Sequence, residues 1–525
     1  MFNTKPKIRT RTVTVPVKKP PAGADKPFST SDAPRKPSQT QANSIANSIA
    51  DGTNGSLGKA SVAAAPTSRY SLTPSGRAQS VSAQSRPDRK SLSVSHVQQR
   101  KRKVTPSTPQ WASSDSESSN DEDEDRLGVR KRQKTSSSME PMGVNRSLEP
   151  DLNRRIRIQD PGLNGEPAKK KPGKEAKLIH GLQMSTGAWN KDFRPAFPGS
   201  EHNLVVRLQY PSPSPPEKFA TAIPHDNSNF NPIDDIYFNI EEIIQHYLPS
   251  DLSAELSSDI TGPVRLLKRA VTKGSPEDFQ SALNDFNALI KAKLEDGTIP
   301  RVLDALHSIP LSLTKRILAQ VYQRTVSPQA HLLRKVKGKE TTYGELLPPF
   351  VHTIFHQTRL NSSSVFVDLG SGVGNVVLQS ALQTGAESWG IEVLPTPASF
   401  ANEQADELRA RAKLWNISLG SIHLLQGDFR KPSDIDAILG RADVVLVNNK
   451  VFPQQLNGVL LDKFLDLKMG CKVVSLASFG GGGKQGLRNE QSIANLFDEE
   501  KFDSGTNSVS WAGESVEYFI ATKAR

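Results

Sequence analysis

The fold is decided by the stretch Val365-Phe366-Val367-Asp368-Leu369-Gly370-Ser371-Gly372-Val373-Gly374-Asn375. In it a short apolar run reaches Asp368, and three glycines at alternate positions then lead into a helix-forming sequence. Glycine lets the backbone turn tightly and approach a ligand without a side chain in the way. The pattern predicts a β-strand, a ligand-binding turn and a helix, although a tight turn without a ligand would use the same glycines.

Short apolar runs alternate with helical sequence from this stretch to the end of the chain. A helix is expected at 397–415, and a terminal hairpin at 508–511 and 517–522. Strands are expected at 365–368, 388–392, 422–426, 444–447 and 472–476. Alternating strands and helices form right-handed βαβ units, which predicts an α/β fold with a mostly parallel, Rossmann-like sheet. We assign residues 341–525 to this domain.

The preceding residues, 186–340, are expected to form a mainly helical N-terminal part of the same region. The clearest helix begins at Ser275, a capping residue, with Pro276 at the first helical position. Apolar residues then recur at helical spacing, and Gly297 ends the helix. No catalytic constellation is recognisable here, so we expect this part to pack against the sheet.

Residues 1–185 differ in composition from the rest of the chain. Residues 1–180 carry 33 Lys and Arg against 17 Asp and Glu, which leaves 34 and 38 of the total 67 and 55 for residues 181–525. The segment is rich in Ser and Pro and poor in aromatic residues, so we predict a long disordered N-terminal tail. Basic clusters at 100–103, 130–134 and 169–174 are typical of nuclear import signals and DNA contacts, or of solvated charge.

Several classes of protein are excluded by simple counts. Cys471 is the single cysteine, so neither an internal disulfide nor a multi-cysteine zinc site can form. No apolar run approaches the length of about 18 residues that a membrane-spanning helix needs, so we expect no membrane partner. His352 and His356 lie four apart, but they lack a clear third ligand, so we interpret them as structural and predict no metal.

Two cofactors compete for the glycine turn. The dinucleotide fingerprint is G-x-G-x-x-G, which places a pyrophosphate at the helix N-terminus. Here the spacing is G-x-G-x-G, and Asp368 precedes it. An acid at that place favours a cationic ligand without phosphate, such as S-adenosylmethionine. Glu392 ends the next expected strand, 24 residues after Asp368, where it can hold two ribose hydroxyls.

Two more motifs follow the ends of expected strands. Asp428 can accept a hydrogen bond from an adenine amino group, and Phe429 can stack on the adenine ring. Taken alone, Phe429 would more often be a core residue. Asn448 and Asn449 follow the fourth strand, where a carboxamide can orient an incoming amine. A pair of asparagines is also a common turn former.

Six motifs together carry a resemblance to one family. They are Thr341-Thr342-Tyr343-Gly344-Glu345-Leu346, the glycine turn, Gly390-Ile391-Glu392, Gly427-Asp428-Phe429, Val447-Asn448-Asn449 and Val509-Ser510-Trp511. In this order they resemble the non-SET histone H3 lysine-79 methyltransferase family, called disruptor of telomeric silencing in fungi. The resemblance covers roughly residues 205–522. Many methyltransferases share the glycine turn, whereas the Tyr-Gly-Glu motif with the Asn pair and the late Trp is far more specific.

The resemblance implies a class I methyltransferase fold, S-adenosylmethionine as cofactor, and a role for each matching residue. Asn448, Trp511 and Tyr518 would line the channel that admits the lysine, and Tyr343 would belong to both the catalytic and the cofactor site. Glu392 would hold the ribose. The remaining cofactor contacts would be Gly344, Glu345 and Leu346 in a lid, Phe366, Val367, Asp368, Leu369, Gly370, Ser371, Gly372, Val373, Gly374 and Asn375 around the cofactor, and Asp428 and Phe429 at the adenine.

The resemblance also implies a substrate, a location and partners. The chain would methylate lysine 79 of histone H3 in nucleosomes, in the nucleus, and act in telomeric silencing and the DNA-damage response. The family is stimulated by ubiquitin on histone H2B, and the basic tail would bind DNA without sequence preference. One departure is Lys450, which stands where animal members have Phe; we expect this cation to face away from an amine channel.

Two other functional classes stay open at this point. A nucleic-acid methyltransferase would share the fold, the cofactor and the basic tail. It would usually carry an Asn/Asp-Pro-Pro-aromatic motif, and residues 448–451 read Asn-Asn-Lys-Val instead. A chromatin-binding protein without catalysis is the other class, and failure to bind the cofactor would favour it.

Overall fold

The computed structural model describes residues 9–10 (backbone only), 146–159, 177–199, 203–226, 230–334, 344–431, 434–479 and 496–525. The three basic clusters of the predicted tail lie outside the described residues, and so does Tyr343 of the predicted lid.

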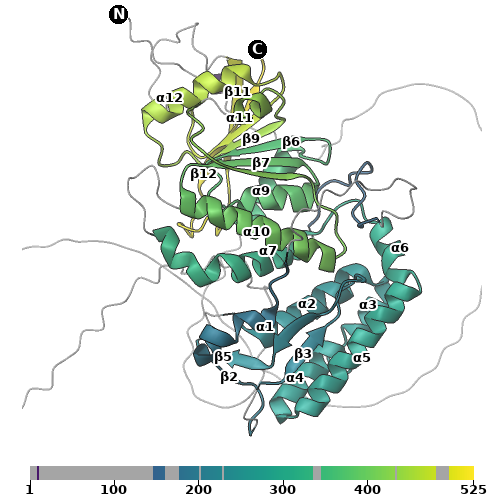
Figure 1. The fold of residues 1–525 in the computed structure, drawn as a ribbon. Helices are drawn as coiled ribbons and strands as arrows, with labels where there is room; N and C mark the ends of the chain where they lie inside the picture. The colour runs from purple at the N-terminus through teal and green to yellow at the C-terminus, as the bar shows by residue number, and fades with distance from the viewer. Residues whose placement is uncertain are drawn as a thin grey trace, which may run out of the picture. The chain divides into compact units, whose positions relative to one another are not determined.

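The sheet domain is built on eight strands in the order β1-β11-β12-β10-β9-β6-β7-β8 (Figure 1). The five strands from β8 to β10 run parallel, and β12 runs antiparallel to both β10 and β11. The bounds are β1 Arg9–Thr10, β6 Val365–Leu369, β7 Glu387–Glu392, β8 Ile422–Gln426, β9 Val444–Val447, β10 Lys472–Ser475, β11 Phe497–Asp503 and β12 Glu517–Lys523. The strand order reverses beside β6, and open α/β sheets bind ligands at such a point, outside the carboxyl ends of the strands.

The predicted α/β fold with a mostly parallel sheet is confirmed, and each of the five parallel strands ends within one residue of its expected position. The central strands β6 and β9 were predictable because all of their residues are buried, so they form short, nearly continuous apolar runs. The edge strand β8 is only partly buried. Val365, Val367 and Leu369 of β6 pack into one layer, whereas Phe366 packs into the other.

Helices cover both faces of the sheet. The layer on the Phe366 face includes α8 (Pro348–Thr358) and α9 (Asn375–Gln379), which runs on into the one-turn π-helix η3 (Ser380–Thr384). The helix α10 (Pro395–Leu414) contacts β7 and β8. The layer on the other face contains α11 (Asp434–Leu439), α12 (Gln454–Lys463) and η4 (Phe464–Asp466). None of the helices described is long and apolar enough to cross a lipid bilayer.

The terminal hairpin is only half correct as predicted. Its second strand is β12, but its first is β11, whereas Val509 makes isolated bridges to Leu346 and Ala512. Five of the seven residues in β11 are charged, so it lacks the apolar run that marked the central strands. Tertiary pairing with β12 makes it a strand in spite of this composition.

The N-terminal part is helical, as predicted, from residue 232 onward. Its helices are α2 (Pro232–Tyr247), α3 (Ser250–Leu256), α4 (Pro263–Lys273), α5 (Pro276–Glu295), α6 (Thr298–Asp304), α7 (Leu311–Thr325) and the 3₁₀ turn η2 (Ser327–Arg334). The Ser275 hydroxyl accepts a hydrogen bond from the Asp278 N–H, which confirms the predicted cap of α5.

The sequence did not reveal the strands before α2. Short elements α1 (Gly181–Met184) and η1 (Gly187–Asp192) precede two small antiparallel sheets. One sheet pairs β2 (Phe193–Pro195) with β5 (Ala222–Pro224), and the other pairs β3 (Val205–Leu208) with β4 (Glu217–Ala220). Each of these strands has only three or four residues, too few for alternation to distinguish a strand from a loop.

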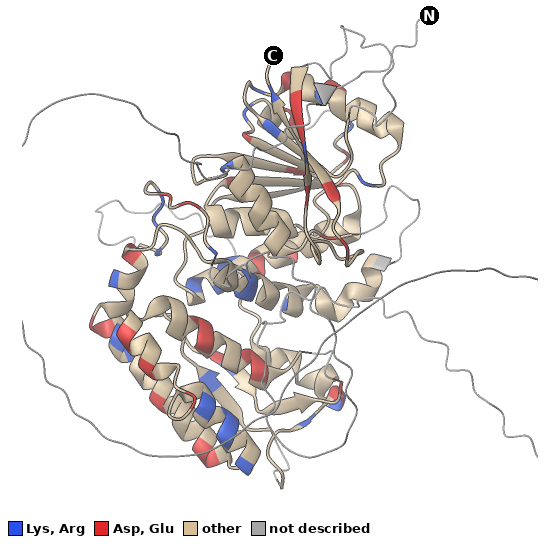
Figure 2. Cartoon of the chain, turned by 180° about the vertical axis from the view of Figure 1, so that it is seen from behind, with Lys and Arg blue, Asp and Glu red and all other residues tan. Residues whose placement is uncertain are grey.

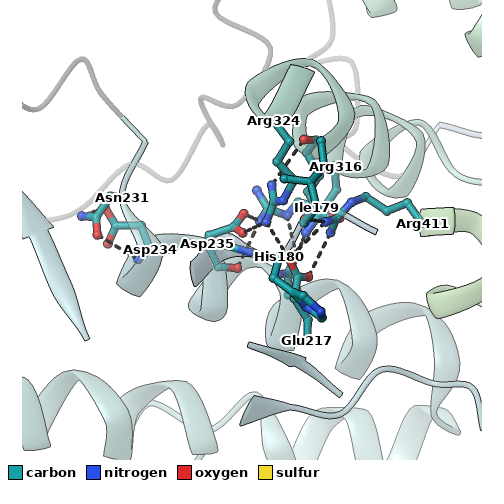
Figure 3. Close-up of polar contacts among 12 residues, drawn as sticks. Ile179, His180, Glu217, Asn231, Asp234, Asp235, Arg316, Arg324 and Arg411 are labelled. Carbon is teal, nitrogen blue, oxygen red and sulfur yellow. Dashed lines mark hydrogen bonds and ion pairs between the residues drawn. The ribbon is translucent and has the colours of Figure 1, made fainter. Parts of the chain in front are cut away.

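A buried ionic network joins the N-terminal part to α10 (Figure 3). Glu217 on β4 accepts hydrogen bonds from Arg324 on α7 at 3.0 Å and from Arg411 on α10 at 2.9 and 3.0 Å. Asp235 on α2 accepts from Arg316 and Arg324. All five side chains are buried, and a buried charge that loses its partner is strongly destabilising. The network therefore specifies how these elements pack.

The prediction that residues 1–185 form one disordered tail is wrong for 146–159 and for 177–185. Residues 146–159 form a strap (the name used below for this segment) that contacts both parts of the chain. The Leu311 N–H donates to the Arg146 carbonyl, and the Asp151 carboxylate accepts from both the N–H and the hydroxyl of Ser362. Leu148 and Ile156 are buried in two different apolar clusters. The composition of residues 1–185 did not reveal these two buried residues, because it averages over a long and mostly polar segment.

Candidate functional site

The glycine turn leaves β6 in a conformation that side chains would resist. Gly370, Gly372 and Gly374 have φ values of +90°, +56° and +83°. The N–H groups of Gly370 and Ser371 donate to the Ile391 carbonyl of β7 at 2.9 and 3.1 Å. The turn is therefore fixed to the neighbouring strand, and α9 begins directly after it. Left-handed backbone at all three positions explains why glycine is needed there.

Two buried carboxylates lie at the start of this turn. Glu392 receives hydrogen bonds from the Gly372 N–H at 2.9 Å and the Leu394 N–H at 2.8 Å, so its place beside the turn is fixed. Asp368 is buried on β6, and desolvation together with the charge of Glu392 raises its pKa to about 8. An ionised Asp368 would be stabilised by a cation, because two buried carboxylates repel each other.

The predicted adenine residues lie at the end of β8. The Asp428 carboxylate accepts three hydrogen bonds from the Arg430 guanidinium, at 2.6 to 2.9 Å, and this contact lowers the Asp428 pKa. Phe429 is buried among the residues of one sheet layer, and its ring stacks on Phe452 at a centroid distance of 6.4 Å. The Phe452 ring in turn lies 3.8 Å from where a Cβ on Gly370 would stand. Phe429 thus reaches the glycine turn through Phe452, and Arg430 is a polar partner that the sequence did not suggest.

The structure brings Gly344, Asn448 and Trp511 together from three distant places in the sequence. The Asn448 side-chain amide donates to the Gly344 carbonyl at 3.4 Å. A Cβ on Gly344 would stand 2.5 Å from the Trp511 indole, so the ring lies directly on the glycine. Asn448 is partly exposed and Trp511 is 41% exposed, so both side chains remain accessible.

This second group lies at the same edge of the sheet as the glycine turn. Asp368 on β6 is paired with Leu446 on β9, and both strands run in the same direction. Gly370 and Asn448 are the first residues beyond the ends of these two strands, so both lie at the carboxyl edge of the sheet. Of the acceptor residues predicted from the sequence, Asn448 thus lies beside the glycine turn at the switch point of the sheet.

A short ladder of hydrogen bonds joins the described lid residues to the segment before Trp511. The Glu345 N–H donates to the Ser510 hydroxyl, and the Ser510 N–H donates to the Glu345 carbonyl, both at 2.9 Å. Leu346 bridges to Val509, and the Tyr322 hydroxyl of α7 donates to the Glu345 carboxylate at 3.0 Å. Ser510 was noticed in the sequence only as part of a motif, because its partner lies 165 residues away.

Tyr518 does not stand with Asn448 and Trp511. Its side chain is 0% exposed, and its hydroxyl donates to the Gln357 side chain of α8 at 2.7 Å. Its ring lies edge-on to Phe350 and stacks on Phe502. These contacts place Tyr518 in the core beneath α8, and they give no support to the predicted place in a lysine channel. The pattern could not reveal this, because aromatic residues serve equally in cores and in channels.

The residues next to the Asn448 position have separate roles. Asn449 is buried, and its amide bonds to both the carbonyl and the N–H of Ala477, so it joins the ends of β9 and β10. Lys450 is exposed. The hydrogen bond from Lys501 lowers the pKa of the Glu517 carboxyl, and the charge of Lys450 adds a smaller effect. Its exposure agrees with the expectation that this cation faces away. His352 is buried and bonds to Gln383, and burial lowers its pKa to about 4, which suits a structural histidine.

Comparisons with known proteins point in one direction. Residues 322–523 match the family model described as histone methylation protein DOT1. The chain is 42% identical to the H3 lysine-79-specific histone-lysine N-methyltransferase of Emericella nidulans over 379 residues, which cover 72% of this chain and 74% of that protein. It is 44% identical to the protein of the same name from Aspergillus fumigatus, again over 72% of this chain and 74% of that protein. A third relative of that name, from Gibberella zeae, is 39% identical and is covered over 70% of its length.

Proposed function

The chain belongs to the family of H3 lysine-79-specific histone-lysine N-methyltransferases, and on this premise we propose that it methylates lysine 79 of histone H3 in nucleosomes, with S-adenosylmethionine as donor. The observation that carries the proposal is the meeting of Gly344, Asn448 and Trp511 at the sheet edge that also holds the glycine turn. A cofactor site and an acceptor site must share one edge if a methyl group is to pass between them.

The residues of the glycine turn fit S-adenosylmethionine better than a dinucleotide. Asp368 has a raised pKa and no recorded hydrogen-bond donor among the described residues, so a cationic amino-acid group would stabilise its charge. The side-chain amide nitrogen of Asn375, at the first position of α9, is buried and has no partner in the described part of the chain. A ligand carboxylate is a suitable acceptor for that donor. A pyrophosphate would instead meet two buried acids.

We assign the remaining contacts by position at the sheet edge. Glu392 would bind the ribose hydroxyls with the lone pairs not used by Gly372 and Leu394. Phe429 and Phe452 would form the apolar wall at the adenine, and Asp428 would turn from Arg430 to the adenine amino group. Gly344, Glu345 and Leu346 would cover the methionine end, with Tyr343 completing this lid.

The protein's part in the reaction is to orient and desolvate the lysine. S-adenosylmethionine supplies, when bound, a methyl group already activated on a sulfonium. Asn448 would hold the lysine nitrogen by a hydrogen bond, and the Trp511 ring would cover its aliphatic stem. Lysine has a pKa of about 10.4 in water, and an apolar wall lowers it and so favours the neutral, nucleophilic form. Alignment of the two groups accounts for much of the rate enhancement.

The substrate determines the location and the partners that we propose. Lysine 79 lies in the folded histone core, so the enzyme would act in the nucleus on intact nucleosomes, in telomeric silencing and the DNA-damage response. Ubiquitin on histone H2B would stimulate it, as in the family. The basic tail would supply sequence-independent affinity for DNA.

Methyl transfer from labelled S-adenosylmethionine tests the proposal directly. The full-length chain is incubated separately with nucleosomes, free histone H3, naked DNA and RNA. We expect label on lysine 79 of histone H3 in nucleosomes. Label on DNA or RNA would instead make the chain a nucleic-acid methyltransferase, and absence of transfer to every substrate would refute the proposed activity.

Two glycine variants test the acceptor site. Gly344→Ala would push a methyl group into the Trp511 indole, and a displacement of about 1 Å at a reacting centre can reduce the rate about 10²-fold. Gly458→Ala on α12 is the control, because a Cβ there meets no atom within 4 Å. Equal activity of the two variants would show that Trp511 does not shape the acceptor site.

A further inference from the structure

Helix α4 differs in charge from the folded region around it. Its sequence, Pro-Val-Arg-Leu-Leu-Lys-Arg-Ala-Val-Thr-Lys, holds four cations and no acid. Residues 181–525 as a whole carry 34 basic and 38 acidic side chains. The neighbouring helix α5 mixes both signs, and Figure 2 shows both signs on the helices of this part. The composition of α4 therefore suits an anionic partner.

The cations of α4 form a single exposed row. Pro263, Leu267 and Ala270 are buried, and the helix packs on α5 and α2. The four cations, Arg265, Lys268, Arg269 and Lys273, are all exposed. Arg265, Arg269 and Lys273 follow at a spacing of four residues, and Lys268, three residues after Arg265, lies beside them. Pro at the first position and the left-handed Gly274 at the end give the helix defined boundaries. The row is therefore mounted on a rigid support.

The row is poorly neutralised by the protein itself. The described part of the chain records no ion pair for Arg265 or Arg269. Lys268 lies 3.9 Å from Glu241, and Lys273 lies 3.6 Å from Asp278, with all four side chains about half exposed. Exposed pairs of this kind contribute between about 0 and 1 kcal/mol, so a stronger anion can replace either acid.

We propose that the exposed face of α4 binds the phosphate backbone of DNA, as a contact with nucleosomal DNA separate from the basic tail. The eight steps from Arg265 to Lys273 rise about 12 Å along the helix. Phosphates follow one another about every 3.4 Å along the axis of each strand, so the row faces about three or four phosphates. Four cations and this number of phosphates are matched in charge. The nucleosomal setting rests on the proposed function, whereas the affinity for DNA does not.

The salt dependence of DNA binding tests the proposal in the full-length chain. Arg265→Gln with Arg269→Gln removes two cations that have no ion pair. The control, Arg207→Gln with Lys218→Gln, removes two exposed cations of the small β3–β4 sheet. Each phosphate contact contributes about −0.9 to the slope of log K against log salt, so the α4 variant should have a slope smaller by about 2 than that of the control. Binding to a DNA duplex and to nucleosomes is measured from about 50 to 200 mM salt, because contacts with phosphates weaken steeply over this range.

Each outcome decides the question. A reduced slope on both duplex and nucleosome, in the α4 variant alone, supports the proposal. Equal slopes in the two variants overturn it, and so does a loss confined to nucleosomes, which would indicate an acidic histone surface as the partner. Circular dichroism checks that α4 remains folded. If the chain methylates no histone but the α4 slope is still reduced, the proposed function fails and the DNA contact stands.

Discussion

Asp368 shows how one residue can link cofactor binding to pH. Burial and the charge of Glu392 raise its pKa to about 8, from an ordinary value of 3.8. The folded chain therefore holds a proton that the unfolded chain releases between these values, so this group's contribution to stability falls as pH rises from about 4 to 8. Binding of a cationic ligand should favour the ionised form of Asp368, because the carboxylate then has a partner of opposite charge.

We expect S-adenosylmethionine binding at pH 7 to release up to about one proton from Asp368. In Asp368→Asn this release should disappear, and affinity should fall by about 10- to 100-fold, since a hydrogen bond to a charged group contributes about 1.5–3 kcal/mol. Calorimetry in buffers of different ionisation enthalpy measures the proton count. Asp462→Asn, an exposed acid on α12, is the control. Unchanged proton release in Asp368→Asn would show that Asp368 does not meet the cation.

At the scale of an element, the strap explains how one helix of the site is held at its far end. The Arg154 guanidinium donates to the carbonyls of Leu382, Gln383 and Ser418 at 2.6, 2.5 and 3.2 Å. Two of these belong to η3, which continues the helix that starts at the glycine turn. Burial lowers the Arg154 pKa to about 10, so it stays charged at neutral pH. The strap thus caps the helix whose other end forms the site.

Arg154→Met should destabilise the chain by about 3–5 kcal/mol and weaken cofactor binding, because it leaves three carbonyls, two of them in buried contacts, without their donor. The adjacent Arg155 is exposed and bonds only to the Gln159 side chain among its recorded side-chain contacts, so Arg155→Met should change stability by less than about 0.5 kcal/mol. Denaturant unfolding and cofactor titration of both variants measure the difference. Equal stability of the two variants would mean that the strap does not hold the helix.

At the scale of the whole molecule, the buried network makes the N-terminal part and the sheet one folding unit. Glu217 lies between Arg324 and Arg411, which come from different parts of the chain. Contact with Arg411 and Arg324 outweighs burial and holds the Glu217 pKa well below its usual value of 4.5. A lowered pKa means that the stabilisation is complete above the unfolded value and is lost only as pH falls below it. The network should therefore persist through the neutral range and weaken in acid.

Glu217→Gln should destabilise the chain by about 3–5 kcal/mol, since it removes the acid that two buried guanidinium groups share and leaves Arg324 with Asp235 and Arg411 with Glu407. Asp406→Asn removes the acid of the exposed Asp406–Arg409 pair on α10 and should cost at most about 1 kcal/mol. Thermal and denaturant unfolding at pH 7 compare the two variants. Similar losses in both would show that burial does not strengthen this network.

The sequence alone determined the sheet and the residues of its turn. Strands buried on both faces must be apolar, and a turn with three left-handed positions requires glycine. The local sequence therefore predicts both features. The Ser275 cap is likewise local, because its bond reaches only three residues along the chain. The order of the motifs suggested the family, and the relatives confirm that the chain belongs to it.

Only the tertiary structure decided which of the predicted residues meet. Gly344, Asn448 and Trp511 are more than sixty residues apart in the sequence, yet Asn448 and Trp511 both contact Gly344. Trp511 reaches Gly344 because the neighbouring residues Glu345 and Leu346 pair with Ser510 and Val509. Tyr518, equally suitable by type, lies in the core instead. The strap and β11 were hidden for the same reason: they are polar segments whose order comes from distant partners, and such pairing leaves no periodic mark on the sequence.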